Sequence, residues 1–451
     1  MKTNFLFFKF LSGFLYFCLS SFSFSTLIAQ DKAFDLQDCL KMAVERNLDL
    51  RTSFLNKEKS LSKSALSKSY LLPQISFKAK FTDNIELPPT TVPGDLFGKP
   101  GQLLDFRFGT QYGANLGFDL EQQVLNFSLA ESYKISKSMT EISETQFQIL
   151  RDDLIHSVGQ SYYKIQMIES KVEMNNHQIR LMDSLIQIVV SRIRRGDALH
   201  VDSMKLVVER NIYAASRQNA LYELQEVKKQ MYNLLDWPED TVLNFQQETF
   251  RKDSLPLLSY DKNNLKNLIL IEQKKNVASR ALQMSKLGRL PTMYAFAHMG
   301  IQNMHDKFHD FINGSWDYAV AVGIGIQVPL FYGSQLNKQT SIRKIELFQN
   351  ELQLKKNYKL SKNNFDIALA QLMAYQASLK GQKDNFALSK EVLDIVKQRY
   401  LQGITTISDL LTTQNSYNNA YLNFLQAYFA YKIAELDVFK ASGNLEKLLK
   451  E

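Results

Sequence analysis

One long helical stretch occurs twice in this chain, and it limits the possible folds more than any other feature. Between Phe127 and Gly196 there is no proline, and Gly159 is the only internal glycine, so no residue there breaks a helix. Eight apolar residues and one asparagine recur in it at alternating steps of three and four: Ile165, Ile168, Val172, Asn175, Ile179, Met182, Ile186, Val189 and Ile193. Such spacing is typical of a coiled-coil seam rather than of a globular helix face.

The same register returns 207 residues later, at Leu372, Tyr375, Leu379, Gln382, Phe386, Ser389, Leu393, Val396 and Tyr400. Gln382 stands in the place of Asn175, and only Ser389 breaks the apolar match. Both stretches end in Arg-x-x-x-Gly, at Arg192–Gly196 and Arg399–Gly403. The chain therefore contains an internal duplication. About seventy helical residues would extend roughly 100 Å, so each copy is predicted to be a strut.

Residues 1–29 are expected to form a secretory signal peptide. Two lysines supply a positive start, a serine-containing apolar stretch follows, and Ala29 offers a small residue at the cleavage site. A transmembrane anchor is the alternative, but the serines and the short apolar run disfavour it. Bulky Phe17 beside Cys18 disfavours lipidation.

Composition and motifs disfavour several function classes. Removing the signal peptide lowers the formal charge from +8 to +6, with basic residues scattered among acidic ones, so no nucleic-acid partner is expected. Cys39 then remains the only cysteine, which excludes an internal disulfide and a cysteine metal cluster. Gly-x-Ser-x-Gly, Walker and His-Glu-x-x-His motifs do not occur, so we expect no enzyme and no cofactor. His305 and His309 would suit a metal if helical, but their predicted surface loop favours no metal site.

Each long helix follows a pair of segments with period-two alternation, such as Ile75, Phe77, Ala79 and Phe81 on one side of a strand. The predicted units are a first repeat at 30–236, a connector at 237–262 and a second repeat at 263–451. In the first repeat we expect an amphipathic helix at 31–70, strands at about 74–83 and 110–125 around a loop at 84–107, and long helices at 127–196 and 198–235. In the second we expect strands at about 291–302 and 317–331, and long helices at 333–402 and 404–442.

Four strands that are apolar on one face and small or polar on the other match the signature of a membrane β-barrel. A soluble antiparallel sheet packed on a helix is the alternative. The great length of the helices favours the membrane, and so do Tyr112, Trp316 and Tyr318, which lie near strand ends, where aromatic belts occur. Four strands cannot close a barrel, and lipid does not tolerate an open sheet edge, so several chains must share one barrel.

Taken together, these features resemble the TolC-type outer-membrane efflux family from Phe34 to Leu448. The resemblance rests on the paired Arg-x-x-x-Gly helix ends, Leu-Pro before a strand at 72–73 and 290–291, Val328-Pro-Leu-Phe331, and Ile407-Ser-Asp-Leu-Leu411. It implies a mainly α fold with a small β part, built from a duplicated unit of two strands and a long helical hairpin. In that fold a trimeric α-helical barrel joins a shared twelve-stranded transmembrane β-barrel.

The resemblance also implies a function. The protein would be an outer-membrane exit duct that extends into the periplasm and serves a tripartite efflux or type I secretion system. It would passively conduct substrates delivered by an inner-membrane transporter and a periplasmic adaptor (membrane fusion) protein. Drug, metal and protein export all suit this architecture. The alternative is a periplasmic coiled-coil scaffold without a pore.

Finally, the resemblance implies roles at the hairpin tips. Asp409 matches an aperture aspartate of the family, whereas Thr412 stands where a second acid is usual. Asp202 and Tyr400 match an acid and a tyrosine that hydrogen-bond to hold the aperture shut, and Thr405 replaces the arginine that reinforces them. Alternatively, Asp202 and Asp409 are first-turn acids that favour a helix N-terminus.

Basic residues crowd both tips. Arg192 and Arg195 precede Gly196, and Arg399 precedes Gly403. They are candidate contacts for acidic ends of an adaptor protein, and a solvated basic tip is the alternative.

Overall fold

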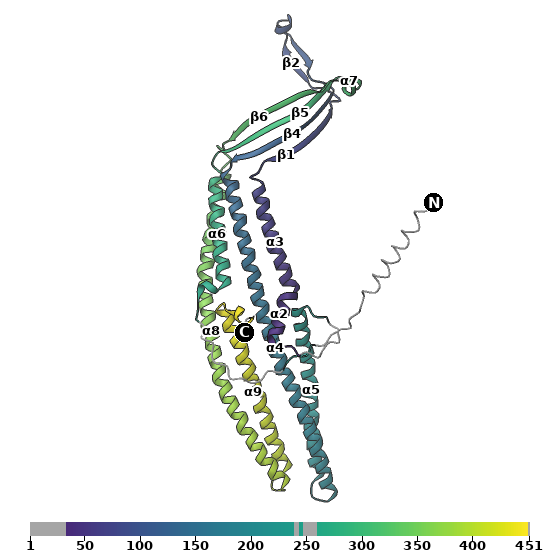
Figure 1. The fold of residues 1–451 in the computed structure, drawn as a ribbon, viewed down its shortest axis with the longest axis vertical. Coiled ribbons are helices and arrows are strands. Elements are labelled where there is room, and N and C mark those ends of the chain that lie inside the picture. Colours follow the sequence, from purple (N-terminus) through teal and green to yellow (C-terminus); the bar gives the residue numbers. More distant parts are fainter. Residues whose placement is uncertain (1–32, 239–242, 247–258, 450–451) are drawn as a thin grey trace, which may run out of the picture.

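The computed structural model describes residues 33–238, 243–246 and 259–449. Within them, a small sheet lies at one end of a long, narrow molecule, and helices run away from it (Figure 1). The expected signal peptide and part of the expected connector lie outside the described residues.

Helices and strands follow the same order in both halves. The first half contains α2 (Leu36–Arg46), α3 (Leu48–Ser69), β1 (Gln74–Asp83), β4 (Tyr112–Leu125), α4 (Phe127–Arg194) and α5 (His200–Leu235). The second contains α6 (Lys266–Leu287), β5 (Thr292–His305), β6 (Asp317–Gln327), α8 (Gln335–Leu401) and α9 (Ile407–Ala441). The described chain is thus mostly helical with a small β part. No helix in the described ranges is both long and apolar enough to span a membrane.

The element boundaries lie within a few residues of the sequence expectation in most cases, and two differences have a clear cause. The helix expected at 31–70 is divided at Asn47, whose Oδ1 accepts a hydrogen bond from Leu50 N at 2.9 Å and so caps α3. The strand expected to reach 331 ends at Gln327, two residues before Pro329, which has no N–H to give to a strand ladder.

A short hairpin and a short helix were not expected. The segment at 84–107 contains the hairpin of β2 (Pro89–Pro93) and β3 (Leu103–Arg107), which projects beyond the sheet (Figure 1). The connection between β5 and β6 contains the short helix α7 (Phe308–Asn313).

The sheet is antiparallel with the order β1-β4-β5-β6, so β1 and β6 are its edges. Its register places Phe77, Phe118, Met299 and Val320 in one row across all four strands. These four side chains are between 56% and 71% exposed. This face of the sheet therefore carries an apolar row that the rest of the chain leaves uncovered, which marks it as a contact surface.

Two aromatic rings cover glycines on the opposite face. Phe296 and Tyr294 of β5 pair with Gly323 and Gly325 of β6. A Cβ atom on Gly323 would lie 2.5 Å from Phe296 Cζ, and one on Gly325 would collide with the Tyr294 ring. The glycines therefore let each ring lie flat across the neighbouring strand, which protects an otherwise weak edge strand.

The pairs α4–α5 and α8–α9 form two antiparallel hairpins whose tips lie farthest from the sheet (Figure 1). Gly196 and Gly403 adopt φ values of +82° and +77°, which only glycine takes without strain. The same closing bond follows each glycine: Asp197 N to Arg192 O and Ile404 N to Arg399 O, both 2.9 Å. The repeated Arg-x-x-x-Gly sequence thus folds twice into one helix-ending turn.

Different surfaces cover the two copies of the repeated seam. In α4, Ile165, Ile168 and Met182 are fully buried. In α8, Leu372 is fully buried, but Tyr375 is 41% exposed, and few residues of this long helix are buried at all. The second copy therefore carries apolar surface that this chain does not cover.

Near the middle of the molecule, α9 packs closely against α4. Gly159 permits this approach, because a Cβ atom there would lie 2.6 Å from Leu436 Cδ1. The surrounding core also takes in side chains of α2 and α5 and of the C-terminal 3-10 helix η3 (Leu445–Leu449).

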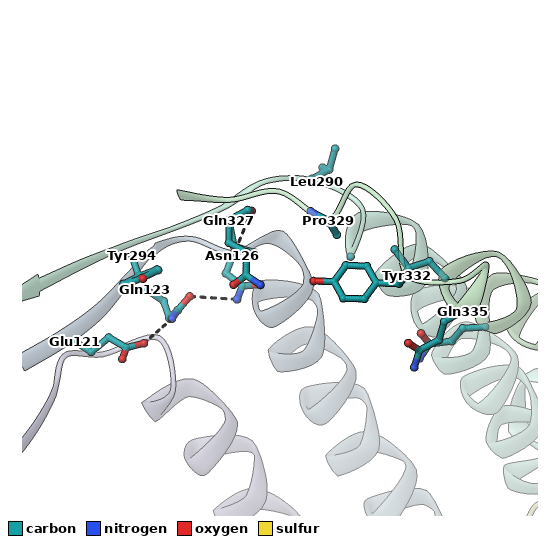
Figure 2. A pocket seen from close by; sticks show the side chains of 13 residues that line it. Glu121, Gln123, Asn126, Leu290, Tyr294, Gln327, Pro329, Tyr332 and Gln335 are labelled. Atoms are coloured by element: carbon teal, nitrogen blue, oxygen red, sulfur yellow. Dashed lines mark hydrogen bonds between the residues drawn. The ribbon is translucent and has the colours of Figure 1, made fainter. Parts of the chain in front are cut away.

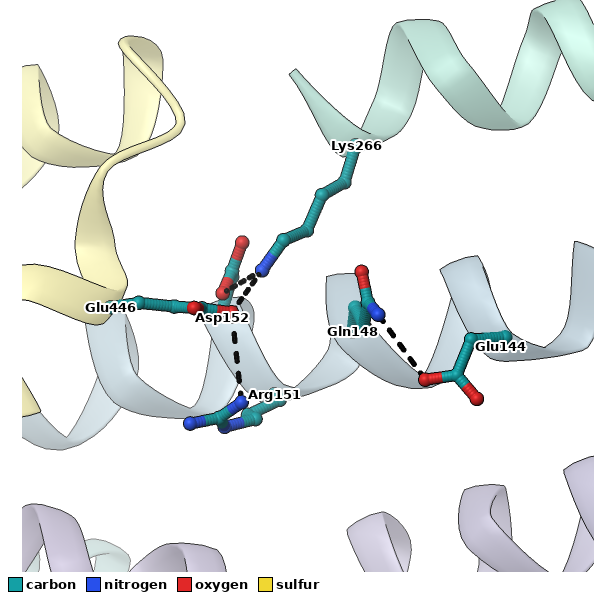
Figure 3. Close-up of polar contacts among 6 residues, drawn as sticks. All are labelled: Glu144, Gln148, Arg151, Asp152, Lys266 and Glu446. Atoms are coloured by element: carbon teal, nitrogen blue, oxygen red, sulfur yellow. Dashed lines mark hydrogen bonds and ion pairs between the residues drawn. The ribbon is translucent and has the colours of Figure 1, made fainter. Parts of the chain in front are cut away.

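A half-buried ion network ties the middle of the molecule together (Figure 3). Lys266 Nζ of α6 donates to Asp152 Oδ1 at 2.9 Å and to Glu446 Oε1 at 2.8 Å, and Arg151 Nη1 lies 3.6 Å from the same Glu446 oxygen. Burial raises the pKa of the Asp152 carboxyl, while the Lys266 charge and hydrogen bond lower it. The network joins α4, α6 and η3.

Candidate functional site

One apolar cluster at the tip takes side chains from both hairpins. Its buried members are Met182, Leu185, Val189, Leu206, Tyr213, Leu393, Tyr400, Ile407, Leu410 and Leu411. They come from the last turns of α4 and α8 and the first turns of α5 and α9. We call this group the tip cluster. It includes Tyr400, which the resemblance assigned to the aperture.

Tyr400 joins α8 to α4 through its ring. The Arg192 guanidinium carbon lies 5.1 Å from the ring centre, and Arg192 Nη2 donates to Leu401 O at 3.4 Å. Burial raises the pKa of the Tyr400 hydroxyl, the Arg192 charge opposes that rise, and the Asp202 charge adds to it. The contact is a cation–π interaction between two neighbouring helix ends.

The hydrogen bond expected between Tyr400 and Asp202 is not formed. Asp202 Oδ2 instead accepts from Leu199 N at 3.4 Å, because the carboxylate is turned toward the first turn of its own helix. It lies close enough to Tyr400 to affect the hydroxyl's pKa, yet no bond joins the two. Asp202 therefore behaves as the first-turn acid of the alternative interpretation.

Asp409 caps the start of α9. Its Oδ2 accepts from Thr406 Oγ1 at 2.7 Å, Thr406 N at 3.2 Å and Thr405 Oγ1 at 3.0 Å, while Thr406 Oγ1 accepts from Asp409 N at 3.1 Å. This reciprocal pair is a capping box. The Thr406 hydroxyl first, then the Thr406 amide and the Thr405 hydroxyl, hold the pKa of the exposed Asp409 carboxyl below its usual value. Thr412 is exposed and donates to Ser408 O at 2.9 Å.

The basic residues of the tips divide into two kinds. Arg192 is half-buried and engaged with Tyr400, so it holds the two hairpins together. Arg195 and Arg399 are exposed beside the exposed turns at Gly196 and Gly403, and Arg195 Nε lies 3.4 Å from Asp197 Oδ2. Arg195 and Arg399 therefore present their side chains to solvent, whereas Arg192 does so only in part.

A chain of hydrogen bonds links the two hairpins and was not predicted from the sequence. It consists of Glu209 and Tyr213 on α5 and Gln414, Asn415 and Asn418 on α9. We call this group the polar seam. Gln414 and Asn418 interrupt an apolar spacing of four and three that includes Ile407 and Leu411, which is the signal that could have revealed them.

A second polar feature lies where the sheet meets the helices (Figure 2). A pocket of about 660 Å³ is lined by five side-chain amides: Gln123, Asn126, Gln327, Gln335 and Gln339. Asn126 Nδ2 donates to Gln123 Oε1 at 3.3 Å, and Gln123 Nε2 donates to Glu121 Oε1 at 3.1 Å. The pocket lies on the polar side of the sheet and offers a largely uncharged, hydrogen-bonding wall.

The two histidines considered as metal ligands lie in different elements. His305 ends β5, and His309 lies in α7, where Asn313 donates to its main-chain oxygen at 3.1 Å. Among the described residues, no group of three His, Cys, Asp or Glu side chains is placed to hold a metal ion.

Known sequences that are similar to this chain are outer-membrane proteins. A family model described as "Outer membrane efflux protein" matches residues 266–444. Outer membrane protein TolC of Escherichia coli K12 is 20% identical over 443 residues, which cover 95% of this chain and 85% of that protein. TolC of Vibrio cholerae is 19% identical over 443 residues, which cover 95% and 94%.

Solved structures share the fold. The Campylobacter jejuni CmeC outer membrane channel superposes with a TM-score of 0.76 at 15% identity, covering 92% of this chain and 88% of that one. The open-state MtrE outer membrane channel of Neisseria gonorrhoeae gives 0.69 at 18% identity, covering 91% and 89%.

Proposed function

The chain belongs to the TolC-like outer-membrane efflux protein family and resides in the outer membrane, and from this premise we propose that three copies form one passive exit duct. The observation that carries the proposal is that a single chain has an unpaired strand edge and an outermost helix on each of two opposite sides, which we call its flanks. Both the sheet and the helical layer stop abruptly at the same two sides, so copies placed side by side complete each other.

The unfinished flanks are open strand edges continued by helices. The sheet order β1-β4-β5-β6 runs parallel to the helix order α3-α4-α6-α8, so β1 and α3 share one flank and β6 and α8 share the other. The exposed apolar side chains on the two flanking helices include Leu48, Phe54, Leu55, Leu61 and Leu66 on α3 and Ile342, Ile345, Phe348 and Leu352 on α8. Each copy therefore offers one flank to the opposite flank of the next, a head-to-tail contact that closes into a ring.

The number three follows from the family resemblance, and it gives a barrel of twelve strands. The apolar row of Phe77, Phe118, Met299 and Val320 would face lipid. The polar side would line the bore, where Asp119 joins Lys78 Nζ at 2.8 Å and His298 Nδ1 at 2.6 Å. Pairing β6 of one copy with β1 of the next leaves no unpaired edge in the bilayer.

The helices would then extend into the periplasm and end at the tip cluster, the closed end of the tunnel. We assign the aperture to Tyr400, Asp202, Thr405, Asp409 and Thr412. We assign adaptor contacts to the tips, at Arg192, Arg195, Gly196, Arg399 and Gly403. An inner-membrane transporter would supply the energy, and the duct itself would only conduct.

Fractionation and conductance test the proposal. The mature protein should separate with the outer membrane, migrate as a detergent-resistant trimer, and conduct ions in planar lipid bilayers. A freely soluble monomer that never associates with lipid would overturn it and favour the periplasmic scaffold.

A further inference from the structure

The polar seam is one continuous chain of hydrogen bonds with a single direction. Its four bonds are Gln414 Nε2 to Asn418 Oδ1 at 3.2 Å, Asn418 Nδ2 to the Tyr213 hydroxyl at 2.6 Å, Tyr213 Oη to Asn415 Oδ1 at 2.6 Å, and Asn415 Nδ2 to Glu209 Oε1 at 3.3 Å. Each central member both donates and accepts, and the chain ends on a carboxylate. Such aligned donors polarise one another and strengthen the chain.

Three of the five side chains of the seam are buried in an apolar environment. Tyr213, Gln414 and Asn418 are only 7%, 4% and 4% exposed, and Tyr213 is itself a member of the tip cluster. Burial raises the pKa of the Tyr213 hydroxyl to about 12, so the hydroxyl remains a donor at physiological pH. Removing one member leaves a buried partner unpaired, which costs more than the bond itself contributes. The seam is therefore sensitive to the loss of any one of its buried members.

Its position gives the seam a mechanical role. It crosses from α5 to α9, which belong to different hairpins, and Lys205 Nζ reaches Ser408 Oγ across the same boundary at 2.6 Å. The hairpins cannot separate at the tip while these side-chain bonds persist. The bond expected between Tyr400 and Asp202 is not formed, so that pair adds no hydrogen bond across the boundary between the hairpins.

We propose that the polar seam of Glu209, Tyr213, Gln414, Asn415 and Asn418 is the latch that keeps the tip of the tunnel closed. Opening breaks the Tyr213 bonds to Asn415 and Asn418 and admits water between α5 and α9. The inference rests on the proposed function, because it presupposes a tunnel that is closed at this end.

The test replaces one oxygen atom and uses a matched control. Tyr213→Phe keeps the ring in the tip cluster and removes only the hydroxyl that links α5 to α9. Tyr417→Phe makes the same change on a half-buried tyrosine packed against the same cluster, whose hydroxyl has no hydrogen bond within the described part of the chain. Two measurements follow: conductance in planar bilayers, and hydrogen–deuterium exchange of residues 404–418 in the solubilised protein.

Tyr213→Phe is expected to shift the ratio of closed to open tips by roughly 5- to 150-fold, seen as higher conductance and faster exchange. Tyr417→Phe should change neither. Glu209→Gln keeps the shape of the side chain but weakens the last acceptor, so it should raise conductance and exchange by a smaller amount. It serves as the test variant if Tyr213→Phe does not assemble.

Three outcomes would overturn the latch. Conductance and exchange unchanged in Tyr213→Phe and Glu209→Gln would mean that the seam does not hold the tip. A lower melting temperature with unchanged conductance would make the seam merely structural. If neither the wild-type protein nor the variants conduct ions, even where exchange is faster, the proposed channel function is wrong. The latch is then wrong as well.

Discussion

The Arg192 guanidinium lies over the Tyr400 ring, 5.1 Å from its centre, at the place where a tyrosine–aspartate hydrogen bond was expected. The attraction uses the face of the ring, so the hydroxyl contributes little to it. The join between α4 and α8 at the tip thus depends on a cation rather than on the Tyr400 oxygen.

This relationship predicts opposite results for two substitutions. Tyr400→Phe should leave bilayer conductance unchanged, because the ring and its cation remain. Arg192→Ala should raise conductance, because it removes a contact worth about 0.5–2 kcal/mol. Higher conductance in Tyr400→Phe would restore the hydroxyl-based clasp and contradict this account.

Two helix-interior glycines should respond differently to alanine. Gly381 in α8 has open space around it, so Gly381→Ala should stabilise the protein by about 0.5–1 kcal/mol through helix propensity. At Gly159 the new methyl group would meet Leu436, so Gly159→Ala should gain nothing and Gly159→Val should cost about 1–3 kcal/mol. Thermal unfolding in detergent measures both. A stabilised Gly159→Val would show that α4 and α9 are not closely packed.

Breaking the central ion network from its two sides should have unequal effects. Lys266→Met leaves the half-buried Asp152 without its cation and should cost about 3–5 kcal/mol, whereas Asp152→Asn should cost less because Lys266 keeps Glu446. Unfolding temperatures of the two variants at neutral pH provide the comparison, with equal losses as the contrary result.

The same network makes a pH prediction. A carboxyl whose folded pKa is raised, as burial raises that of Asp152, binds its proton more tightly in the folded state, so stability increases as pH falls through that pKa. Lys266→Met removes the opposing cation and should be partly rescued at mildly acidic pH. The double variant with Asp152→Asn should lose that rescue. Unfolding temperatures measured across pH provide the readout.

Asp409 predicts the opposite dependence. Its folded pKa is depressed by the Thr406 hydroxyl, the Thr406 amide and the Thr405 hydroxyl, so its cap is complete above the unfolded value of 3.8 and is lost as pH falls through the folded pKa. The first amides of α9 should lose exchange protection, corrected for intrinsic rates, over that acidic range. Asp409→Asn should abolish the pH dependence. A variant that behaves like wild type would show that Asp409 does not cap the helix.

Cys39 should be inert in the folded protein. It is fully buried, and burial first, then the charges of Asp35 and Asp38, raises the pKa of its thiol to about 12. A maleimide should therefore label the mature protein only after unfolding. Rapid labelling of the native protein would show that α2 is not buried in this way.

Much of the architecture was predictable from periodicity and turn chemistry. The repeated seam predicts α4 and α8, and the repeated glycine predicts both tips, because a helix-ending turn with positive φ favours that residue. The period-two pattern predicts the apolar face of the sheet. Each of these signals is local, so the chain displays it without tertiary context.

What escaped prediction depends on contacts between distant segments. Asn47 divides a helix that looks continuous, and it does so while its Nδ2 donates to Leu234 O at 3.0 Å, a partner 187 residues away. The polar seam likewise joins α5 to α9 across about two hundred residues. Asp202 accepts a hydrogen bond from the nearby Leu199 N rather than from the distant Tyr400 hydroxyl that the family resemblance suggested.

The helix order α3-α4-α6-α8 has a consequence for how copies of the chain would assemble. In the proposed ring, the contact between α4 and α6 joins the two repeats of one polypeptide, so half of the joints between repeats form when the chain folds. Only α3 and α8 must pair with another copy. Internal joints form at the high effective concentration of tethered partners. Fewer encounters are needed than for a ring of separate repeats, so the yield of closed rings should fall less steeply as the protein is diluted in its membrane.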